Sequence, residues 1–143
     1  MKKVLAFLMP VFGAIYLNAY IRSAVLDVVY TDYIRIINTY LYHPFSPVLY
    51  FRKDALTRLP ITFFERLINI VFFKYSTMFD MTLGVIFLAL MGLVIGLFMT
   101  KENIKVNYFI LLMMMVFSLS QWEMLTNGTG WVHFLAFFLF VVH

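Results

Sequence analysis

The sequence predicts an all-α integral membrane protein, a helical bundle with about four transmembrane helices and two surface-lying amphipathic helices after the first span. Of its 143 residues, 64% are hydrophobic and only 13% are charged, whereas soluble domains average about 45–50% and about 25%. A run without any charge extends from Met81 to Thr100. As a helix it would be about 30 Å long, the thickness of a bilayer's hydrocarbon core. Aromatic residues reach 20%, which is typical of lipid-facing surfaces and interfacial belts.

Composition also excludes several classes of site and partner. The chain has no cysteine, which rules out disulfides, thiolate nucleophiles and thiolate metal sites. Its net charge of +4 is small and scattered. Such a charge suits anionic lipid head groups and gives no reason to expect a nucleic-acid partner. The length allows about four spans and no separate soluble domain.

We predict one transmembrane domain, 1–143, with spans at about 4–21, 78–100, 106–122 and 130–143. The basic start and apolar centre of the first span are also typical of a signal peptide. However, the stretch 16–20 lacks the small-x-small pattern that a signal peptidase reads, which favours an uncleaved span. Pro10 lies inside this span and is expected to kink it.

The last predicted span is unusually short. From Trp131 to His143 it has thirteen residues, about 20 Å of helix, whereas a span needs about 20 residues. Two interpretations remain: a half-inserted helix packed against a partner, or the front part of a longer protein. We favour the second and expect the chain to be incomplete at its C-terminus.

The section 22–76 is the most polar part of the chain and still carries apolar residues at helical spacing. It predicts two amphipathic helices on the membrane surface, joined by a loop. Thr62 and Glu65 read as a capping box that opens the second helix just after Pro60. The alternative is a small soluble cap folded on itself. The two apolar sets are Ile34, Ile37 and Leu41, then Ile61, Phe64, Leu67, Ile68, Val71, Phe72 and Tyr75.

The central span has a predicted start and a predicted packing face. Thr77 and Asp80 repeat the capping pattern at its beginning. Gly92 and Gly96 form a GxxxG motif, which lets another helix approach closely.

The distribution of basic residues predicts the orientation. Lys2 and Lys3 fall on the same side as Lys101 and Lys105 if two spans separate them, and the positive-inside rule places that side in the cytoplasm. The section 22–76 is then extracytoplasmic. It holds seven of the eleven basic residues, which opposes this orientation. However, its length is about the upper limit of the loops to which the rule applies, and several of its charges lie far from the span ends.

Three acids are then expected near the outer membrane surface: Asp27, Asp32 and Glu123. An acid there can act as a general base or hold a divalent cation. Structural roles compete with this interpretation, and for each residue taken singly they are favoured. Asp32 would support a helix N-terminus, Asp27 would pair with Arg22 or Arg35, and Glu123 would be a solvated interfacial charge.

The histidines do not predict a metal centre. His43, His133 and His143 lie in separate segments without ligand spacing, and zinc sites need three or four protein ligands. The sequence therefore does not identify a cofactor.

The layout resembles the front end of GT-C-type polytopic membrane glycosyltransferases. One span, an acid soon after it, two surface helices and further spans follow one another in that family. The segment Phe117–Glu123 resembles a stretch of uncharacterised bacterial members in which Gln-x-Glu opens the second outer loop. Those members continue with Asn and Leu-x-Gly, whereas this chain has Met124–Gly128 there.

The resemblance implies a sugar donor linked to polyprenyl phosphate. It implies a first-loop catalytic acid at Asp27 or Asp32, of which we prefer Asp32, and a second-loop acid at Glu123. Basic side chains would stabilise the departing lipid phosphate, with Arg22, Arg35 and Arg66 as candidates. The later spans of such enzymes are absent, so this chain by itself is not expected to be active.

Two other function classes remain open. A small non-catalytic membrane subunit would dock a larger membrane partner through its GxxxG face and amphipathic helices. A transporter or channel would show ionisable residues or broken helices at mid-membrane depth, and here the sequence offers only Pro10.

Overall fold

The computed structural model describes residues 2–24, 43, 45–48 and 60–143, and this part of the chain contains helices and no strand. The all-α prediction is therefore confirmed for these residues. The elements are α1 (Lys2–Ala24), α3 (Pro60–Phe73), α4 (Thr77–Lys101), α5 (Val106–Val116), the 3-10 turn η2 (Leu119–Gln121), α6 (Trp122–Thr126) and α7 (Trp131–Val142).

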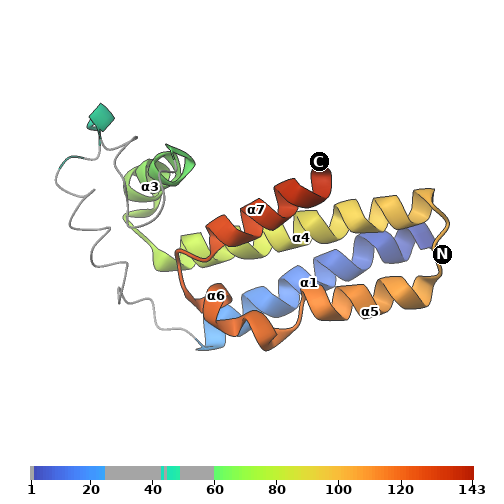
Figure 1. Ribbon diagram of the computed structural model, residues 1–143. Helices are drawn as coiled ribbons and strands as arrows, with labels where there is room; N and C mark the ends of the chain where they lie inside the picture. Colours follow the sequence, from blue (N-terminus) through green and yellow to red (C-terminus); the bar gives the residue numbers. More distant parts are fainter. Residues whose placement is uncertain (1, 25–42, 44, 49–59) are drawn as a thin grey trace.

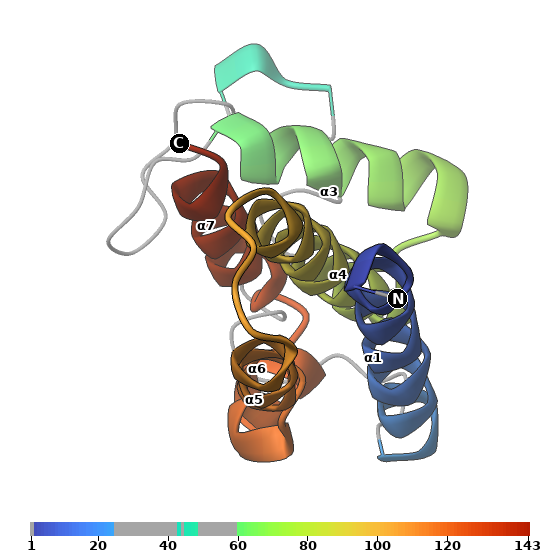
Figure 2. The same ribbon diagram turned by 90° about the vertical axis from the view of Figure 1, so that its right-hand side faces the viewer.

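Helices α1 and α4 lie side by side in opposite directions and form the centre of the bundle (Figure 1). Helix α7 packs along one side of α4, and α5 with α6 lies below α4 and beside α1 (Figure 2). The core consists of apolar side chains from these helices, among them Leu17, Leu88, Met113 and Phe134.

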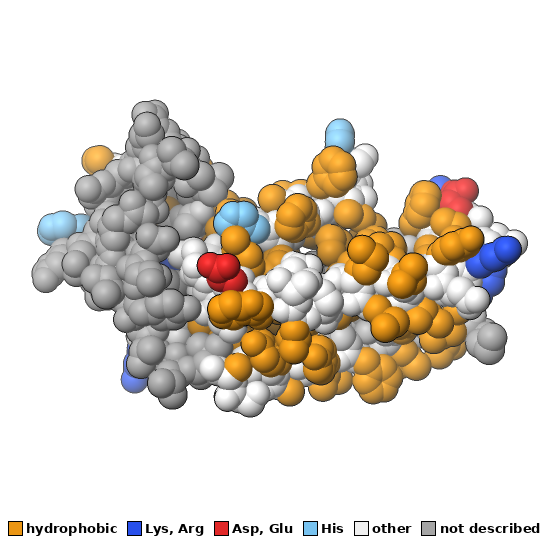
Figure 3. Space-filling model, turned by 60° about the horizontal axis from the view of Figure 1, so that its bottom comes forward, with side chains coloured by type: hydrophobic (Ala, Val, Ile, Leu, Met, Phe, Trp, Pro, Cys, Tyr) orange, Lys and Arg blue, Asp and Glu red, His pale blue; other side chains and the backbone are white. Residues whose placement is uncertain are grey.

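Within the described residues, three segments are long and apolar enough to cross a membrane: Lys2–Ala24, Thr77–Lys101 and Val106–Thr126. Helix α7, at the predicted fourth span, has 12 residues and is shorter. On the face seen in Figure 3, hydrophobic side chains cover the length of the bundle, and charged side chains gather at its two ends. This distribution is the one expected of a membrane protein.

The GxxxG motif of α4 packs against α1 within the chain. A Cβ added at Gly96 would lie 2.7 Å from the carbonyl oxygen of Ala6, and one at Gly92 would lie 3.3 Å from the Cβ of Pro10. The distance at Gly96 leaves no room for a side chain, and the distance at Gly92 is tighter than an ordinary van der Waals contact. The predicted close approach is confirmed, and the helix that makes it is α1.

The third predicted span contains a break. Helix α5 ends at Val116, and a 3-10 turn follows before α6 begins. At the break, the ring of Phe117 enters a notch between Gly13 and Gly92, so that a Cβ at Gly13 would lie 2.4 Å from the ring. The ring is 7% exposed. The chain thus leaves the helical path where an aromatic ring fills the space above two glycines.

Helix α3 lies across the bundle axis, beside the beginning of α4 (Figures 1 and 2). A helix over this stretch was predicted, and it begins at Pro60, two residues before Thr62, so Thr62 lies inside the helix and not at its cap. Helix α4 is capped by Ser76, whose hydroxyl accepts a hydrogen bond from the Phe79 amide at 3.3 Å. The other predicted amphipathic stretch, with Ile34, lies outside the described residues.

The polarity of α3 is opposite to the usual arrangement of a surface helix. Its side chains that face the protein include Glu65, Arg66 and Asn69. Its outward-facing side chains include Phe64 and Phe72. These polar residues are buried against α4 and do not form the water-facing side that an amphipathic surface helix has.

Candidate functional site

The structure describes only one of the three predicted catalytic acids. Glu123 lies on α6 with its side chain exposed. Asp27 and Asp32 lie outside the described residues. Among the residues that are described, no group of three or more His, Cys, Asp or Glu side chains is placed to hold a metal ion.

Glu123 is held at the edge of the bundle by a tightly bonded turn. Asn127 donates its backbone N–H to the Glu123 carbonyl at 3.1 Å. The Asn127 side-chain oxygen accepts hydrogen bonds from the Thr129 amide at 3.0 Å and from the Thr129 hydroxyl at 2.9 Å. A Cβ at Gly130 would lie 2.0 Å from the Met124 carbonyl oxygen, so this turn requires glycine there.

Glu123 also belongs to the same end of the bundle as the last turn of α1. Figure 1 shows α6 close to the end of α1 and far from its start. Asp27 and Asp32 follow that last turn by a few residues in the sequence. Helix α1 therefore ends, at Ala24, at the end of the bundle where Glu123 lies.

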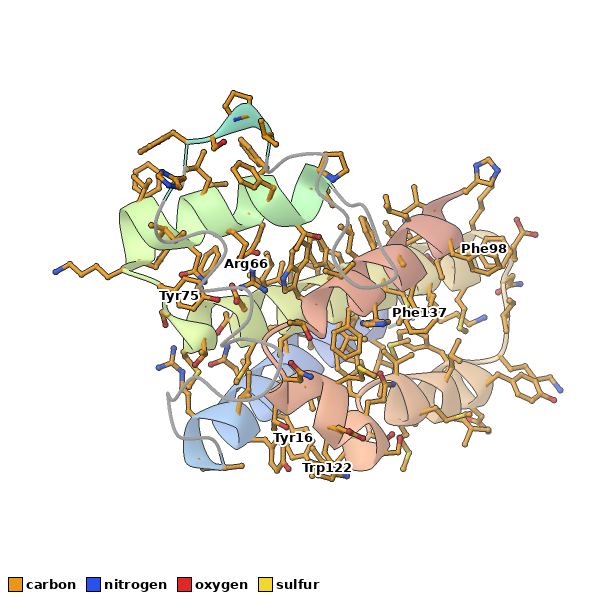
Figure 4. The ribbon with its side chains drawn as sticks, turned by 60° about the vertical axis from the view of Figure 1, so that its left-hand side comes forward. Tyr16, Arg66, Tyr75, Phe98, Trp122 and Phe137 are labelled. Carbon is orange, nitrogen blue, oxygen red and sulfur yellow. The ribbon has the colours of Figure 1, made fainter. Side chains whose placement is uncertain are left out.

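A groove runs between α5–α6 and α7, with α4 at its base, and has a volume of about 520 Å³. This volume is within the range of ligand pockets, about 300–1,000 Å³. Most of its lining is apolar, including Leu88, Met91 and Phe137, and its polar lining consists of Ser120, Gln121 and His133. Phe137 lies on α7 (Figure 4), and its side chain is 56% exposed. In the sequence, Glu123 precedes the lining residue Met124 directly and follows the lining residue Gln121 by two positions.

A buried set of polar side chains joins α3 to α4. We call Glu65, Arg66, Asn69 and Asp80 the α3–α4 polar cluster. Arg66 Nη1 forms an ion pair with Asp80 Oδ2, and Asn69 Nδ2 donates to Asp80 Oδ1 at 2.7 Å. Arg66 lies between the two helices with Tyr75 near it (Figure 4), and its guanidinium carbon is 5.9 Å from the centre of the Tyr75 ring.

Asn69 also fixes the connection between the two helices. Its side-chain oxygen accepts from the Ser76 amide at 2.9 Å, and its side-chain nitrogen donates to the Ser76 carbonyl at 3.0 Å. Lys74 and Tyr75, between them, have positive φ angles of 54° and 64°. Left-handed conformations cost free energy in non-glycine residues, so the Asn69 bonds help to hold this turn.

Glu65 completes the cluster as an uncharged acid at neutral pH. Its Oε2 is 3.6 Å from Arg66 Nε. Burial raises the pKa of Glu65 to about 9, the nearby Asp80 side chain acts in the same direction, and the Arg66 guanidinium opposes the shift. Within the described residues, the cluster pairs the Arg66 guanidinium with the Asp80 carboxylate, as a buried charge requires.

The cluster changes the interpretation of Arg66. This side chain is 0% exposed and is paired with Asp80. These facts do not fit a role in binding a lipid phosphate. Sequence reasoning missed the cluster, although an acid in the first turn of an otherwise uncharged span, Asp80, was a signal that a cation should lie nearby.

Comparisons with protein-family models, with curated proteins and with solved structures gave no match.

Proposed function

We propose that this chain is part of a polytopic membrane glycosyltransferase, with its N-terminus in the cytoplasm, that moves sugar from a polyprenyl-phosphate carrier to an extracytoplasmic acceptor. One observation supports this most: Glu123 lies at the same end of the bundle as the last turn of α1, and Asp27 and Asp32 follow that turn by a few residues in the sequence. A transferase site at a membrane surface needs its carboxylates on the same side of the membrane.

In this proposal the first-loop acid, Asp32 or alternatively Asp27, takes the proton of an acceptor hydroxyl. The acceptor oxygen then bonds to the anomeric carbon of the sugar, and the carrier phosphate leaves with the electrons of the broken bond. Glu123 is accessible for substrate contact because its side chain is exposed. A divalent cation, if one takes part, would be bound by these acids, since hard cations prefer oxygen ligands.

The departing phosphate needs positive charge. With Arg66 buried in the α3–α4 polar cluster, Arg22 and Arg35 remain as candidates. Arg22 is exposed at the end of α1, and its Nε donates to the Asn18 side-chain oxygen at 2.8 Å. Arg35 lies outside the described residues.

The test is sugar transfer by the complete protein in membrane vesicles. We expect Asp32→Ala and Glu123→Ala to abolish transfer and Asp27→Ala to reduce it less. Glu102→Ala is the matched control, because Glu102 is an exposed acid at the opposite end of the bundle. If Asp32→Ala and Glu123→Ala keep the activity of this control, the proposed catalytic roles are wrong.

The second candidate is a small non-catalytic subunit that docks a larger membrane partner. It is favoured by the groove between α5–α6 and α7, a surface that stays open after the GxxxG motif has packed against α1 within the chain. A natural stop codon after His143 and stable co-purification with a larger membrane protein would support it. A reading frame that continues into further spans would favour the transferase.

A further inference from the structure

Helix α3 presents apolar side chains outward and polar side chains inward. Phe72 is 74% exposed and Phe64 56% exposed, whereas Arg66 and Asn69 are 0% exposed. A surface helix surrounded by water shows the opposite pattern. The outward face of α3 is therefore made for an apolar environment.

The connection to α4 fixes the depth at which α3 lies. Helix α4 has 25 residues, about 37 Å of helix at about 1.5 Å per residue, several ångströms more than a hydrocarbon core of about 30 Å. Its first turn, with Asp80, is therefore expected near the boundary between acyl chains and head groups. Only residues 74–76 separate α3 from this turn, and the Asn69–Ser76 hydrogen bonds shorten the connection further.

The direction of α3 fits the same boundary. It lies across the bundle axis, beside α4 (Figure 2), so it runs along a membrane that α4 crosses. Lys74, at the end of α3, is exposed, and a lysine at this depth can reach lipid phosphates while its stem covers apolar surface.

We propose that α3 is an in-plane membrane helix whose outer face, formed by Phe64, Val71 and Phe72, contacts bilayer lipid, while the α3–α4 polar cluster holds its inner face against α4. The helix lies deeper than an ordinary amphipathic surface helix, because it has no polar face directed toward water. The lipid of one leaflet covers this face, not a second copy of the chain or another protein. This inference is independent of the sugar-transfer proposal.

Site-directed spin labelling tests the proposal directly. The chain has no cysteine, so each variant carries one label without further substitution. Phe64→Cys and Phe72→Cys place the label on the outer face of α3, and both side chains are exposed, so folding is preserved. Glu123→Cys and Glu102→Cys are controls at exposed polar positions. The protein is reconstituted in phosphatidylcholine vesicles, and label collisions with oxygen and with a neutral nickel chelate are measured.

Oxygen concentrates in the acyl region and the nickel chelate in water. We expect the ratio of oxygen to nickel collisions at 64 and 72 to exceed the ratio at both controls severalfold. A ratio equal to that of the controls would place the face in water and overturn the proposal. Labels reached by neither reagent would mean that protein covers the face, which would overturn it as well.

Discussion

Removing the Asp80 carboxylate should reveal Glu65 as a reserve partner for the buried guanidinium. Breaking a buried ion pair by removing one partner costs about 3–5 kcal/mol, because the other charge stays buried without compensation. In Asp80→Asn, however, Glu65 remains 3.6 Å from Arg66 Nε. The loss of Asp80 also removes two causes that raise the pKa of Glu65, its hydrogen bond and its charge, while burial still raises it. We predict that the Glu65 pKa falls and that Glu65 takes over part of the pairing.

The expected magnitudes follow from this exchange. Glu65→Gln removes no charge at neutral pH and should cost less than about 1 kcal/mol. Asp80→Asn should cost about 1–2 kcal/mol, since Glu65 compensates and the Asn69 side chain can still donate to the new amide oxygen. The double variant leaves Arg66 with neither acid and should cost about 3–5 kcal/mol. The non-additive part is then about 1–3 kcal/mol, within the range measured for residues of one network.

The assay is the free energy of unfolding in detergent micelles, from titration with a denaturing detergent followed by circular dichroism. Glu102→Gln, an exposed acid far from the cluster, serves as the control and should change stability little. Additivity of the two single variants within about 0.5 kcal/mol would refute the exchange between Glu65 and Asp80. A cost of Glu65→Gln equal to that of Asp80→Asn would refute the uncharged state of Glu65.

Three further predictions concern other parts of the structure. Because the folded protein keeps a proton on Glu65 that the unfolded chain releases above its ordinary pKa of 4.5, stability should fall as the pH rises from there toward about 9. Glu65→Gln should flatten this part of a pH–stability curve, and an unchanged slope would contradict the raised pKa. Gly96→Leu forces a side chain against the Ala6 backbone and should destabilise the bundle by about 1–3 kcal/mol or more in the same unfolding assay, whereas Leu97→Ala, at an outward position of α4, should change it little. Gly13→Val displaces the Phe117 ring from its notch and should increase proteolysis at the break after α5, a result that Gly13→Val combined with Phe117→Ala should partly reverse.

Local sequence features account for the helices that were predicted correctly. The uncharged run Met81–Thr100 lies inside α4, because a helix satisfies its own backbone hydrogen bonds and apolar side chains allow it to enter lipid. Pro60 begins α3, as expected from the preference of proline for the first turn of a helix. The close packing at Gly92 and Gly96 follows from the absence of side chains.

The break after α5 could not be predicted in the same way. The stretch from Tyr108 to Phe117 is continuously apolar, and nothing in it marks an end to the helix. Phe117 leaves the helical path because Gly13 and Gly92, far away in the sequence, provide a notch for its ring. Such a cause exists only between packed helices.

The sequence by itself determined that this protein is helical and apolar enough for a membrane, since hydropathy and helix length depend only on neighbouring residues. The tertiary structure decided which way α3 faces. Glu65, Arg66 and Asn69 have the same helical spacing whether they face water or protein, and the choice rests on Asp80, which α4 brings to Arg66 and Asn69. A buried charge needs its partner within ion-pair distance, and that partner is supplied by folding.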